Sequence, residues 1–405
     1  MVPKGWEHTT FDNHIDCLTG FAFSSDGYSD EKNGTRLLRG DNIEPGKLRW
    51  ENAKFWPEIY SEKLNRYFLQ EGDFVIALDR TWVSSGLKVA EVAKSDLPCL
   101  LVQRVMRIRS KKTLEQNLLR QYFSGYLFEQ YVKKNQTATA VPHISPNDVK
   151  GFALLLPPLP EQKKIAQILS AWDSAISVTE KLITNSQQQK KALMQQLLTG
   201  KKRLLDENGM RFSAEWCICN LSEVAYIVMG VSPSSEAYND IGIGLPLIQG
   251  NADIKCRISI PRVYTSEVTK ECSPGDILLS VRAPVGSIAI SHHKACIGRG
   301  ISTIKSKDNV SQKFLYQWLL WFEPRWGSLS QGSTFESINS DDIKSLKLSM
   351  PDLKEQQKIA AVLSAADAEI STLEKKLACL KDEKKALMQQ LLTGKRRVTV
   401  DADAV

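Results

Sequence analysis

A long segment that occurs twice constrains the fold of this chain more than any other feature. The stretch from Pro157 to Arg203 is repeated from Pro351 to Arg397 at a shift of about 194 residues, without a gap and with roughly 28 of 47 aligned positions identical. This period is far too long for the stacked units of a solenoid. The repeat therefore predicts two related half-proteins joined head to tail.

Each copy of the repeat carries the same two motifs. P-x-L-x-E-Q-x-K-I-A runs from Pro157 to Ala166 and from Pro351 to Ala360. A-L-M-Q-Q-L-L-T-G-K runs over 192–201 and again over 386–395. The segments that precede the two copies agree much less and differ in length. Each half is therefore expected to consist of a divergent globular part followed by a long segment that resembles its twin.

The repeated segments have the apolar pattern of coiled-coil helices. Their heptad positions alternate spacings of four and three, and Gly200 and Gly394 stand where helices commonly end. A helix of about 38 residues would be about 57 Å long and would expose an apolar stripe if it stood alone. We expect the two helices to pair antiparallel, since two equivalent halves would be related by a pseudo-twofold axis. Packing of each helix on its own globular core is the alternative.

The predicted seam contains large, small and polar positions. Lys190 and Lys384 interrupt it as polar layers, which can fix the register of a coiled coil. Trp172 corresponds to the small Ala366 of the other helix, and we expect the large side chain to face the small one. The positions expected to pair the helices are Ile165, Leu169, Trp172, Ile176, Ile183, Leu193 and Leu197, and Ile359, Leu363, Ile370, Leu373, Leu377, Leu387 and Leu391.

A chain of 405 residues is too long for one compact core and fits two or more domains. Short β-rich runs and helical segments alternate in both globular parts, which predicts mixed α/β domains. The expected elements are strands at Asp73–Leu78, Leu100–Ile108, Gly275–Ser280 and Ser287–Ile290 and helices at Leu114–Lys133 and Gln312–Phe322. The expected boundaries are a globular domain over 1–156, a helix over 157–200, a linker over 201–210, a globular domain over 211–349, a helix over 350–394 and a tail over 395–405.

The charge and the cysteine content of the chain indicate its binding partner and its cellular compartment. The net charge of +7 and the pI of about 8.8 suit a polyanionic partner. The eight cysteines follow no metal-binding spacing, which is typical of a reducing cytosol. No apolar run approaches the about 20 residues that a membrane-spanning helix needs, and no signal peptide is recognisable. We expect a cytoplasmic protein without a membrane segment or a bound metal.

Basic and amide residues gather in the loops of both globular parts. Arg, Lys, Asn and Gln are the side chains that read base edges, and Arg and Lys also neutralise phosphates. Any one of them can equally be a solvated surface residue, so the clustering in both halves carries the hypothesis. The candidate DNA-binding residues are Arg36, Arg39, Asn42, Lys47, Arg49, Arg80, Lys88, Arg104 and Arg107 in the first half and Gln249, Asn251, Lys255, Arg257, Arg262, Arg282 and Arg299 in the second.

Common catalytic motifs are absent from the sequence. It contains no G-x-x-x-x-G-K-[ST] phosphate loop, no G-x-S-x-G elbow and no H-E-x-x-H zinc motif. The Asn-Pro-Pro-aromatic or Asp-Pro-Pro-aromatic tetrapeptide with which amino-methyltransferases act on a flipped base is also missing. We expect a binding and scaffolding protein with no catalytic residues of its own.

The duplicated P-x-L-x-E-Q-x-K-I-A and A-L-M-Q-Q-L-L-T-G-K motifs resemble those of the specificity (S) subunit of type I restriction–modification enzymes. The segments Leu247–Asn251 and Gly275–Leu278 and the Pro284-x-Gly286 turn are also similar to that family. The first half departs from the pattern, because 81–86 (T-W-V-S-S-G) replaces the Pro-x-Gly turn. The resemblance covers nearly the whole chain.

The resemblance implies a prokaryotic DNA-recognition subunit. Each globular half would be a target recognition domain for one part of a bipartite, asymmetric site, and the helices would set the unread gap. The helices would also dock two methyltransferase (M) subunits, and the assembly would recruit two restriction (R) subunits. S-adenosylmethionine, ATP and Mg would act in those partners and not in this chain.

Other hypotheses stay open at this point. The chain could be a coiled-coil DNA-binding or adaptor protein outside restriction, or the recognition subunit of another type of restriction–modification system. It could also be a nuclease or methyltransferase in its own right, fused to recognition modules, although the missing motifs oppose this.

Overall fold

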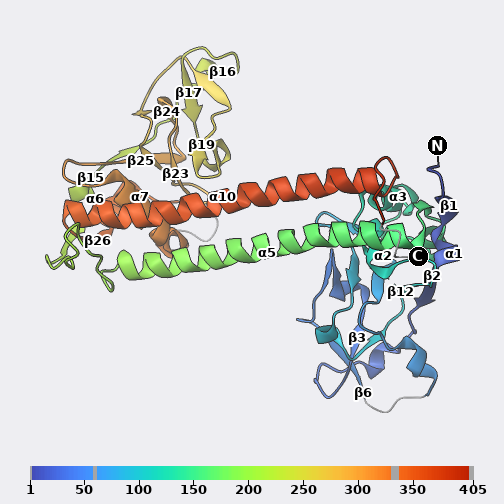
Figure 1. Ribbon diagram of the computed structural model, residues 1–405. Helices are drawn as coiled ribbons and strands as arrows, with labels where there is room; N and C mark the ends of the chain where they lie inside the picture. Colours follow the sequence, from blue (N-terminus) through green and yellow to red (C-terminus); the bar gives the residue numbers. More distant parts are fainter. Residues whose placement is uncertain (1, 58–61, 330–336, 401–405) are drawn as a thin grey trace. The chain divides into compact units, whose positions relative to one another are not determined.

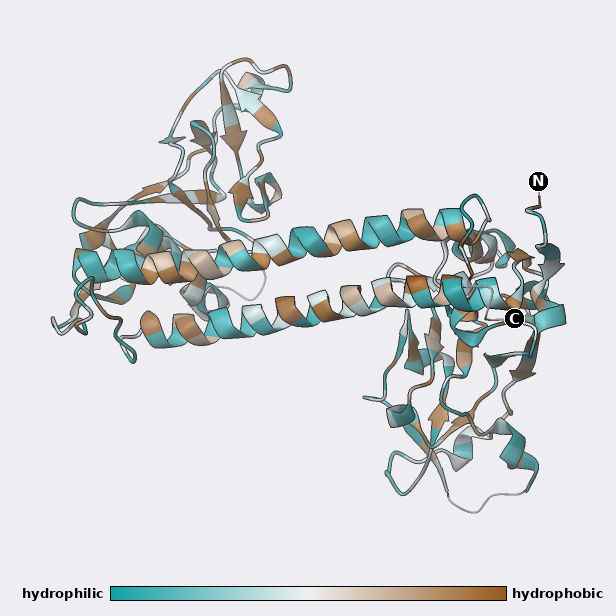
Figure 2. Ribbon diagram, in the orientation of Figure 1, coloured by the Kyte–Doolittle hydropathy of each residue, from teal (hydrophilic) through white to brown (hydrophobic). Residues whose placement is uncertain are grey.

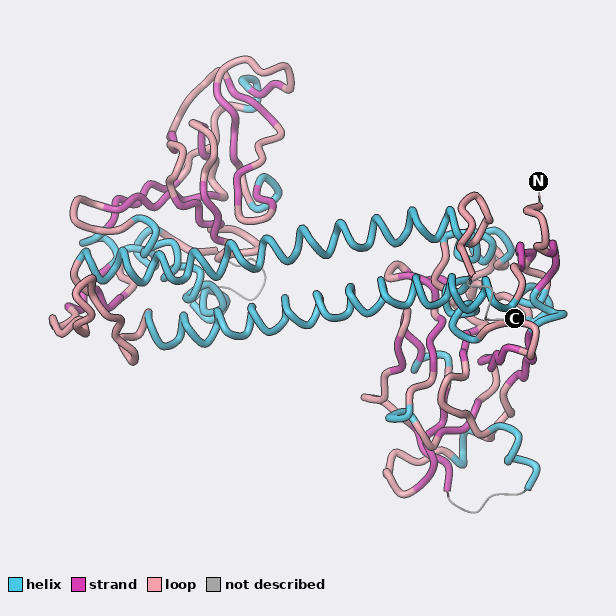
Figure 3. The backbone as a smooth tube through the Cα atoms, in the orientation of Figure 1, coloured by secondary structure: helices cyan, strands magenta, loops and turns pink. Residues whose placement is uncertain are grey.

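The computed structural model describes residues 2–57, 62–329 and 337–400, and its chain divides into two compact units (Figure 1). Unit 1 comprises Met1–Glu180 with Lys376–Val405, and unit 2 comprises Lys181–Lys375. Each unit holds one globular half together with one end of both long helices, α5 (Leu159–Leu197) and α10 (Leu353–Leu391). Figure 3 shows strands gathered in the globular halves and unbroken helix in both repeated segments. The predicted mixed α/β class with two long helices is confirmed.

The two long helices run antiparallel in unit 1. Arg397, just past α10, pairs with Glu161 near the start of α5, and Lys384 pairs with Asp173 further along α5. Residue numbers therefore rise along one helix as they fall along the other, which confirms the predicted antiparallel arrangement.

Unit 2 has the same arrangement with the roles of the helices exchanged. Arg203, just past α5, pairs with Glu355 near the start of α10, and Lys190 pairs with Asp367. Figure 2 shows apolar positions recurring between polar ones along both helices. A glycine with positive φ follows each helix, Gly200 at +70° and Gly394 at +68°, as expected for helix ends.

The antiparallel pairing corrects one detail of the sequence analysis. Trp172 lies in unit 1 and Ala366 lies in unit 2, so these two residues are equivalent to each other and do not face each other. In an antiparallel pair the start of one helix meets the end of the other. The expectation that the large side chain packs on the small one was therefore wrong.

The described residues of unit 1 form two main sheets and three strand pairs. The four-stranded sheet has the order β10-β7-β12-β2 and the three-stranded sheet has the order β11-β3-β6. The strands are β2 (Ile15–Thr19), β3 (Gly34–Leu38), β6 (Lys54–Pro57), β7 (Phe74–Ala77), β10 (Val89–Glu91), β11 (Cys99–Leu101) and β12 (Val105–Ser110), with the pairs β1 (Glu7–Thr10) and β13 (Ala153–Leu156), β4 (Ile43–Glu44) and β5 (Lys47–Leu48), and β8 (Trp82–Val83) and β9 (Gly86–Leu87). The short helices are α1 (Phe11–His14), α2 (Gln116–Phe123), α3 (Tyr126–Asn135), α4 (Pro146–Lys150) and the 3₁₀ helices η1 (Ser25–Gly27), η2 (Gly40–Asn42), η3 (Glu62–Tyr67) and η4 (Lys94–Asp96).

Unit 2 repeats this order of elements with longer sheets. Its six-stranded sheet has the order β15-β25-β22-β23-β19-β18 and its five-stranded sheet has the order β16-β20-β17-β24-β21. The strands are β15 (Ala225–Met229), β16 (Tyr238–Asn239), β17 (Leu245–Ile248), β18 (Ile254–Lys255), β19 (Ile258–Ser259), β20 (Val263–Thr265), β21 (Glu271–Cys272), β22 (Ile277–Ser280), β23 (Ile288–Ile290), β24 (Ala295–Ile297) and β25 (Ile301–Ser306), with the pair β14 (Cys217–Asn220) and β26 (Lys347–Met350). The helices are α6 (Leu221–Val224), α7 (Gln312–Phe322), α8 (Trp326–Leu329), α9 (Ser340–Lys344) and the 3₁₀ helices η5 (Ser235–Ala237), η6 (Asn251–Asp253) and η7 (Glu323–Arg325).

Both long helices are built into the core of each unit. In unit 1, Ile165 and Leu169 of α5 are buried in one cluster with Leu391 of α10. In unit 2, Ile359 and Leu363 of α10 are buried with Leu197 of α5. The helix ends therefore pack both on each other and on the adjacent globular half. This burial anchors each globular half to the helix pair, because every fully buried Leu or Ile contributes about 1.5–3 kcal/mol.

Two predicted elements are divided in the structure. The expected helix over Leu114–Lys133 is two helices, α2 and α3, separated at Ser124 and Gly125. The expected strand over Leu100–Ile108 is divided into β11 and β12, which belong to different sheets. Among the described residues, no helix is long and apolar enough to cross a membrane.

Candidate nucleic-acid interface

Four of the predicted DNA-binding residues surround one hollow in unit 1. The hairpin β4–β5 supplies Lys47 and is followed by Arg49, while Arg80 and Lys88 come from the segments that follow β7 and precede β10. These side chains line a hollow of about 550 Å³, with Asp41 also at its wall. Convergent cations around an open concavity are suited to an anionic ligand such as a phosphate.

The charges in this hollow are only partly neutralised. Glu44 accepts ion pairs from Lys47 at 3.2 Å and Arg49 at 3.3 Å. Arg80 is exposed and has a positive φ of 48°, and its backbone N–H donates to the Pro142 carbonyl at 2.6 Å. Burial lowers the pKa of the half-buried Lys88 ammonium, and this outweighs the nearby Asp41 carboxylate, which raises it, while the Arg49 and Arg80 guanidiniums lower it further. A bound anion would favour the charged form of Lys88 and so raise its pKa again.

A second group of predicted residues in unit 1 is engaged inside the domain. Arg36 donates to the carbonyls of Ser95 and Leu97 at 3.1 and 3.0 Å and stacks over Trp50. The Asn42 side chain is buried, accepts from the backbone N–H of Arg39 and donates to a carbonyl. These bonds shape the loops after β3.

Two further candidates in unit 1 have carboxylate partners. Arg107 is buried and pairs with Asp16. Burial lowers the pKa of Arg107. Arg104 is exposed, has a positive φ of 66° and lies 3.7 Å from Asp79, which also bonds His143 Nδ1 at 2.7 Å. Arg107 is therefore held inside the domain, whereas the Arg104 side chain is exposed and accessible to a ligand.

In unit 2, glycines bring Arg299 beside Gln249. The Gly298 N–H donates to the carbonyl of Ile248, and the Gly300 N–H donates to that of Gln249. A Cβ at Gly300 would lie 2.2 Å from the Gln249 carbonyl oxygen, so only glycine permits this approach. The exposed Arg299 therefore lies next to Gln249, and its backbone N–H and Nε both donate to Ser232 Oγ, at 3.2 and 3.3 Å.

Gln249 joins a small polar network. Its Nε2 donates to the Tyr238 hydroxyl at 2.8 Å, and its backbone N–H donates to the buried Asp253 carboxylate. The exposed Arg262 donates to the same carboxylate at 2.9 Å. We call Gln249, Arg262 and Arg299 the unit 2 ridge. Arginine and amide groups held in this way suit the hydrogen-bond patterns of base edges.

The remaining candidates of unit 2 are Asn251, Lys255, Arg257 and Arg282. Arg257 donates to the Ile288 carbonyl at 3.1 Å and pairs with Glu323, and that bond raises its pKa. Lys255 and Arg282 are exposed, and Asn251 is half-buried at the start of η6.

Sequence reasoning missed the residues that support these side chains. Ser232, Tyr238 and Asp253 hold the unit 2 ridge, and Asp79 and His143 bond near Arg104. They are single polar residues in divergent loops, so no pattern marks them. The Gly-Arg-Gly triplet over 298–300 was a usable signal, because paired glycines indicate close backbone approach.

The helix pair carries a repeated set of polar contacts. Lys190 Nζ lies 2.5 Å from Asp367 Oδ1 in unit 2, and Lys384 Nζ lies 2.6 Å from Asp173 Oδ1 in unit 1. Gln317 donates to Asp367, and Gln121 donates to Asp173, both at 2.8 Å. The lysines placed in polar layers by the heptad analysis therefore meet carboxylates.

The expected pairing residues differ in burial along the helices. Ile165, Leu169, Ile183, Leu197, Ile359, Leu363 and Leu391 are buried, whereas Trp172, Ile176, Leu193, Ile370, Leu373, Leu377 and Leu387 are half-buried. Burial of the expected pairing positions is therefore deepest near the ends of each helix, and Ile183 is the member of that set buried near the middle of α5, where Thr179 is buried as well. Among the described residues, no group of three or more His, Cys, Asp or Glu is placed to hold a metal ion.

Comparison with known proteins gives a consistent result. A family model described as the type I restriction modification DNA specificity domain matches twice, at residues 27–186 and 214–381. A protein of Methanocaldococcus jannaschii described as the specificity subunit of the type I restriction enzyme MjaX is 31% identical over 412 residues, which cover 98% of this chain and 95% of that protein. The EcoAI specificity subunit of Escherichia coli is 35% identical over 182 residues, which cover 45% of this chain and 30% of that subunit.

Solved structures resemble the chain over nearly its whole length. A chain from a structure on complex assembly and conformational transition of the type I R-M system has a TM-score of 0.62 and 25% identity, covering 98% of this chain and 100% of that one. The type I restriction–modification S subunit from M. genitalium has the same fold, with a TM-score of 0.59 at 14% identity over 97% of both chains.

Proposed function

Since this chain belongs to the family of type I restriction–modification DNA specificity subunits, we propose that each of its two target recognition domains reads one part of a bipartite, asymmetric DNA site. The observation that carries the proposal is the recurrence of one recognition fold with two different polar surfaces. Unit 1 presents the basic hollow around Lys88, and unit 2 presents the ridge around Arg299. Different surfaces on equivalent folds suit two unlike half-sites.

The two surfaces suggest different kinds of DNA contact. Lysines and arginines around a hollow suit phosphates, which position a protein on the duplex. Arginine and glutamine held by a polar network suit base edges, which specify the sequence. On this basis Lys47, Arg49, Arg80 and Lys88 would position unit 1, while Gln249 and Arg299 would read bases for unit 2.

The helix pair would set the distance between the half-sites. In each unit an arginine–glutamate ion pair and a lysine–carboxylate layer fix the register of α5 against α10. A fixed register gives a fixed length of helix between the recognition domains. Half-sites on one face of DNA are about 34–36 Å apart for each helical turn, which is within the reach of a helix of 39 residues at about 1.5 Å per residue.

The exposed side of the helix pair would dock the methyltransferase subunits. Val178 and Leu182 are one helical turn apart on α5 and are 56% and 46% exposed. Apolar residues at this spacing on an exposed helix commonly contact a partner helix. Because both helices end in the same A-L-M-Q-Q-L-L-T-G-K sequence, we propose one methyltransferase subunit at each unit and two restriction subunits recruited by the complex.

The chemistry would then reside in the partner subunits. The chain would supply sequence reading and scaffolding, while adenine methylation with S-adenosylmethionine and ATP- and Mg-dependent translocation and cleavage would occur in the methyltransferase and restriction subunits.

Reconstitution with the cognate methyltransferase subunit tests this function. The complex should transfer labelled methyl groups to duplex DNA, and mapping of the methylated adenines should give one bipartite motif with a constant gap. The chain alone should show no methyl transfer. Methylation by the chain alone would indicate an enzyme, and a reconstituted complex without sequence preference would indicate an adaptor.

A further inference from the structure

Unit 1 contains an apolar pocket that the recognition and helix-pairing roles leave unused. Its volume is about 590 Å³, and it lies where the end of α10 meets α2, α3 and β13. Tyr122, Phe152 and Leu154 line one side, and Met388 of α10 and Leu392, just past its end, line the other. A cavity of this size and lining is typical of a binding site for an apolar group.

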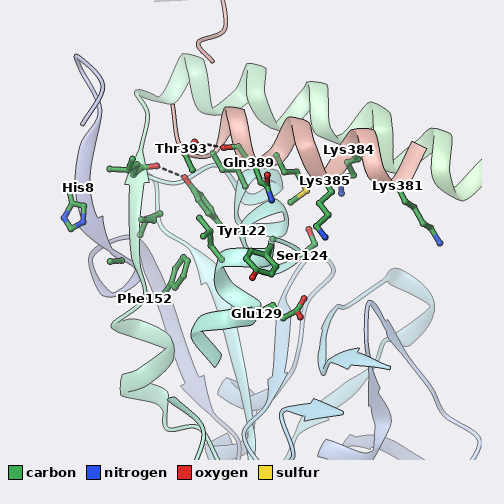
Figure 4. Close-up of a pocket in the computed structure, with 18 of the residues that line it drawn as sticks. His8, Tyr122, Ser124, Glu129, Phe152, Lys381, Lys384, Lys385, Gln389 and Thr393 are labelled. Carbon is green, nitrogen blue, oxygen red and sulfur yellow. Dashed lines mark hydrogen bonds between the residues drawn. The ribbon is translucent and has the colours of Figure 1, made fainter. Parts of the chain in front are cut away.

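Two exposed apolar side chains line the pocket together with the charged Glu129, Lys381, Lys384 and Lys385. Tyr126 and Leu127, the first residues of α3, line it and are 49% and 55% exposed. Figure 4 shows Gln389 and Lys385 extending from α10 toward Tyr122 and Ser124. Large exposed apolar side chains around a cavity commonly mark an interaction site.

Unit 2 carries a large aromatic side chain at the position that corresponds to Gly125 of the pocket. Gln121 and Gln317 make the same bond to equivalent aspartates, so α2 and α7 align and Gly125 corresponds to Trp321. Trp321 packs against the unit 2 core, and its Nε1 donates to Gln195 Oε1 at 3.1 Å. Gln195 is the counterpart of Gln389, which lines the pocket of unit 1.

We propose that the unit 1 pocket receives an aromatic side chain of the methyltransferase subunit that docks on this end of the helices. The proposal rests on the proposed function, because it assumes that this subunit docks there. Unit 2 provides the template for the occupant, which is a ring in the apolar cavity with a polar edge toward the glutamine of α10. The amide of Gln389 would bond that edge, as Gln195 bonds the indole of Trp321.

The pocket gives the two docking sites different chemistry. The A-L-M-Q-Q-L-L-T-G-K sequence is the same at both ends, whereas Gly125 at the unit 1 cavity corresponds to the large Trp321 in unit 2. A partner residue inserted there would anchor one subunit more firmly than the other. Buried aromatic anchors commonly dominate the affinity of an interface.

A tryptophan at Gly125 tests the proposal by filling the pocket from within. The φ of −82° at Gly125 suits any residue. A Cβ there would lie 3.1 Å from the Tyr122 carbonyl oxygen and 3.2 Å from that of Gln121. Gly125→Ala adds the same crowding without an indole and is the matched control.

Native mass spectrometry of the full chain titrated with the cognate methyltransferase subunit gives the readout. We expect wild type and Gly125→Ala to bind two subunits and Gly125→Trp to bind one of them at least tenfold more weakly. Equal binding by Gly125→Trp and Gly125→Ala would overturn the proposal. Absence of any binding to wild type would instead overturn the docking function on which the proposal rests.

A second pair of changes decides the question if Gly125→Trp does not fold. Tyr126→Ser with Leu127→Ser alters only exposed apolar groups at the mouth and should also weaken one of the two sites. In addition, a photo-crosslinking benzoylphenylalanine at position 127 should couple to a methyltransferase peptide at or beside an aromatic residue. Coupling elsewhere, or unchanged binding by the double serine variant, would contradict the proposal.

Discussion

The two units hold the long helices with the same polar contacts but pack their cores with different apolar side chains. In both, a carboxylate near the start of a long helix bonds an arginine and a tryptophan, which are Arg397 and Trp6 for Glu161 in unit 1. The counterparts for Glu355 in unit 2 are Arg203 and Trp216. The polar contacts fix the register of the helices, so substitutions at these residues are poorly tolerated. The domain cores need only apolar side chains of suitable total volume, so different side chains can serve there.

The fillings of the two cores differ accordingly. Unit 1 packs Phe11 against Phe123, Phe128 and Phe152, with ring centroids 5.1–5.9 Å apart. Unit 2 uses a different set, in which Trp318 stacks on Phe322 at 5.3 Å and Phe322 meets Trp326 edge-on at 5.1 Å. The two recognition halves therefore differ even where they pack against the long helices, and in unit 1 a pocket lies at this place.

The largest difference is expected from removing the buried carboxylates. Glu355→Ala should destabilise unit 2 by about 3–5 kcal/mol, because it leaves Arg203 and the Trp216 N–H without their partner. Glu161→Ala should destabilise unit 1 less, because Arg397 is 41% exposed against 20% for Arg203 and can turn to water.

Cysteine reactivity in urea can measure the two units separately. Burial raises the pKa of Cys99 in unit 1 to about 12 and also raises that of Cys272 in unit 2, so both thiols should react only after unfolding. In Glu355→Ala, Cys272 should become labelled at a lower urea concentration than in wild type. In Glu161→Ala, Cys99 should do so, by a smaller shift. Equal shifts would contradict the difference in burial.

The lysine–aspartate layers should behave alike in the two units. Asp173→Ala should cost about 2 kcal/mol, since it leaves the nearly buried Lys384 without a counter-charge. Asp367→Ala should cost about as much through Lys190. Combining either change with Lys→Met at its partner should restore most of the loss in urea unfolding. If only one of the two aspartate variants lost stability, the two layers would not be equivalent.

DNA affinity should separate the unit 2 ridge from the unit 1 hollow. Arg299→Ala should cost about 1–3 kcal/mol at one base pair of the second half-site and leave the first half-site unchanged. Lys88→Ala should weaken all sequences about equally and reduce the salt slope by about one. Arg282→Ala is the matched comparison in unit 2. Measurement uses the reconstituted complex on single-substitution duplexes, and a uniform loss for Arg299→Ala would make Arg299 a phosphate contact.

The smallest effect should be a pH dependence of binding. Burial lowers the pKa of Lys88 in the free protein, whereas a neighbouring phosphate would favour its charged form. Binding then takes up a proton, so affinity should fall as pH rises through the lowered pKa. Lys88→Arg keeps its charge and should flatten this dependence. An unchanged slope in Lys88→Arg would separate Lys88 from the DNA contact.

The long helices were predictable because their periodicity is a local property of the sequence. The heptad pattern located α5 and α10, and it marked Lys190 and Lys384 as polar layers. It could not supply Asp173 and Asp367, whose role depends on which residues an antiparallel partner brings near. Periodicity also gave no reason for the break at Ser124 and Gly125 that separates α2 from α3.

The recognition surfaces were predictable only as residue types. The charges of Lys88 and Arg299 suggested DNA, but their surroundings depend on contacts between distant loops. Nothing in the sequence distinguished Arg107, which is buried against Asp16, from the exposed Arg104. The assignment of individual residues to DNA stays a prediction.

Lengthening both helices together tests the central claim that they set the gap. Seven residues of helix-forming sequence, inserted after Glu180 in α5 and after Lys375 in α10, add two turns while leaving the contacts within each unit unchanged. The insertion adds about 10.5 Å of helix, which corresponds to about three base pairs. Mapping of methylated adenines should give the same two half-sites with a gap about three base pairs longer. An unchanged gap, or an altered half-site, would contradict the account.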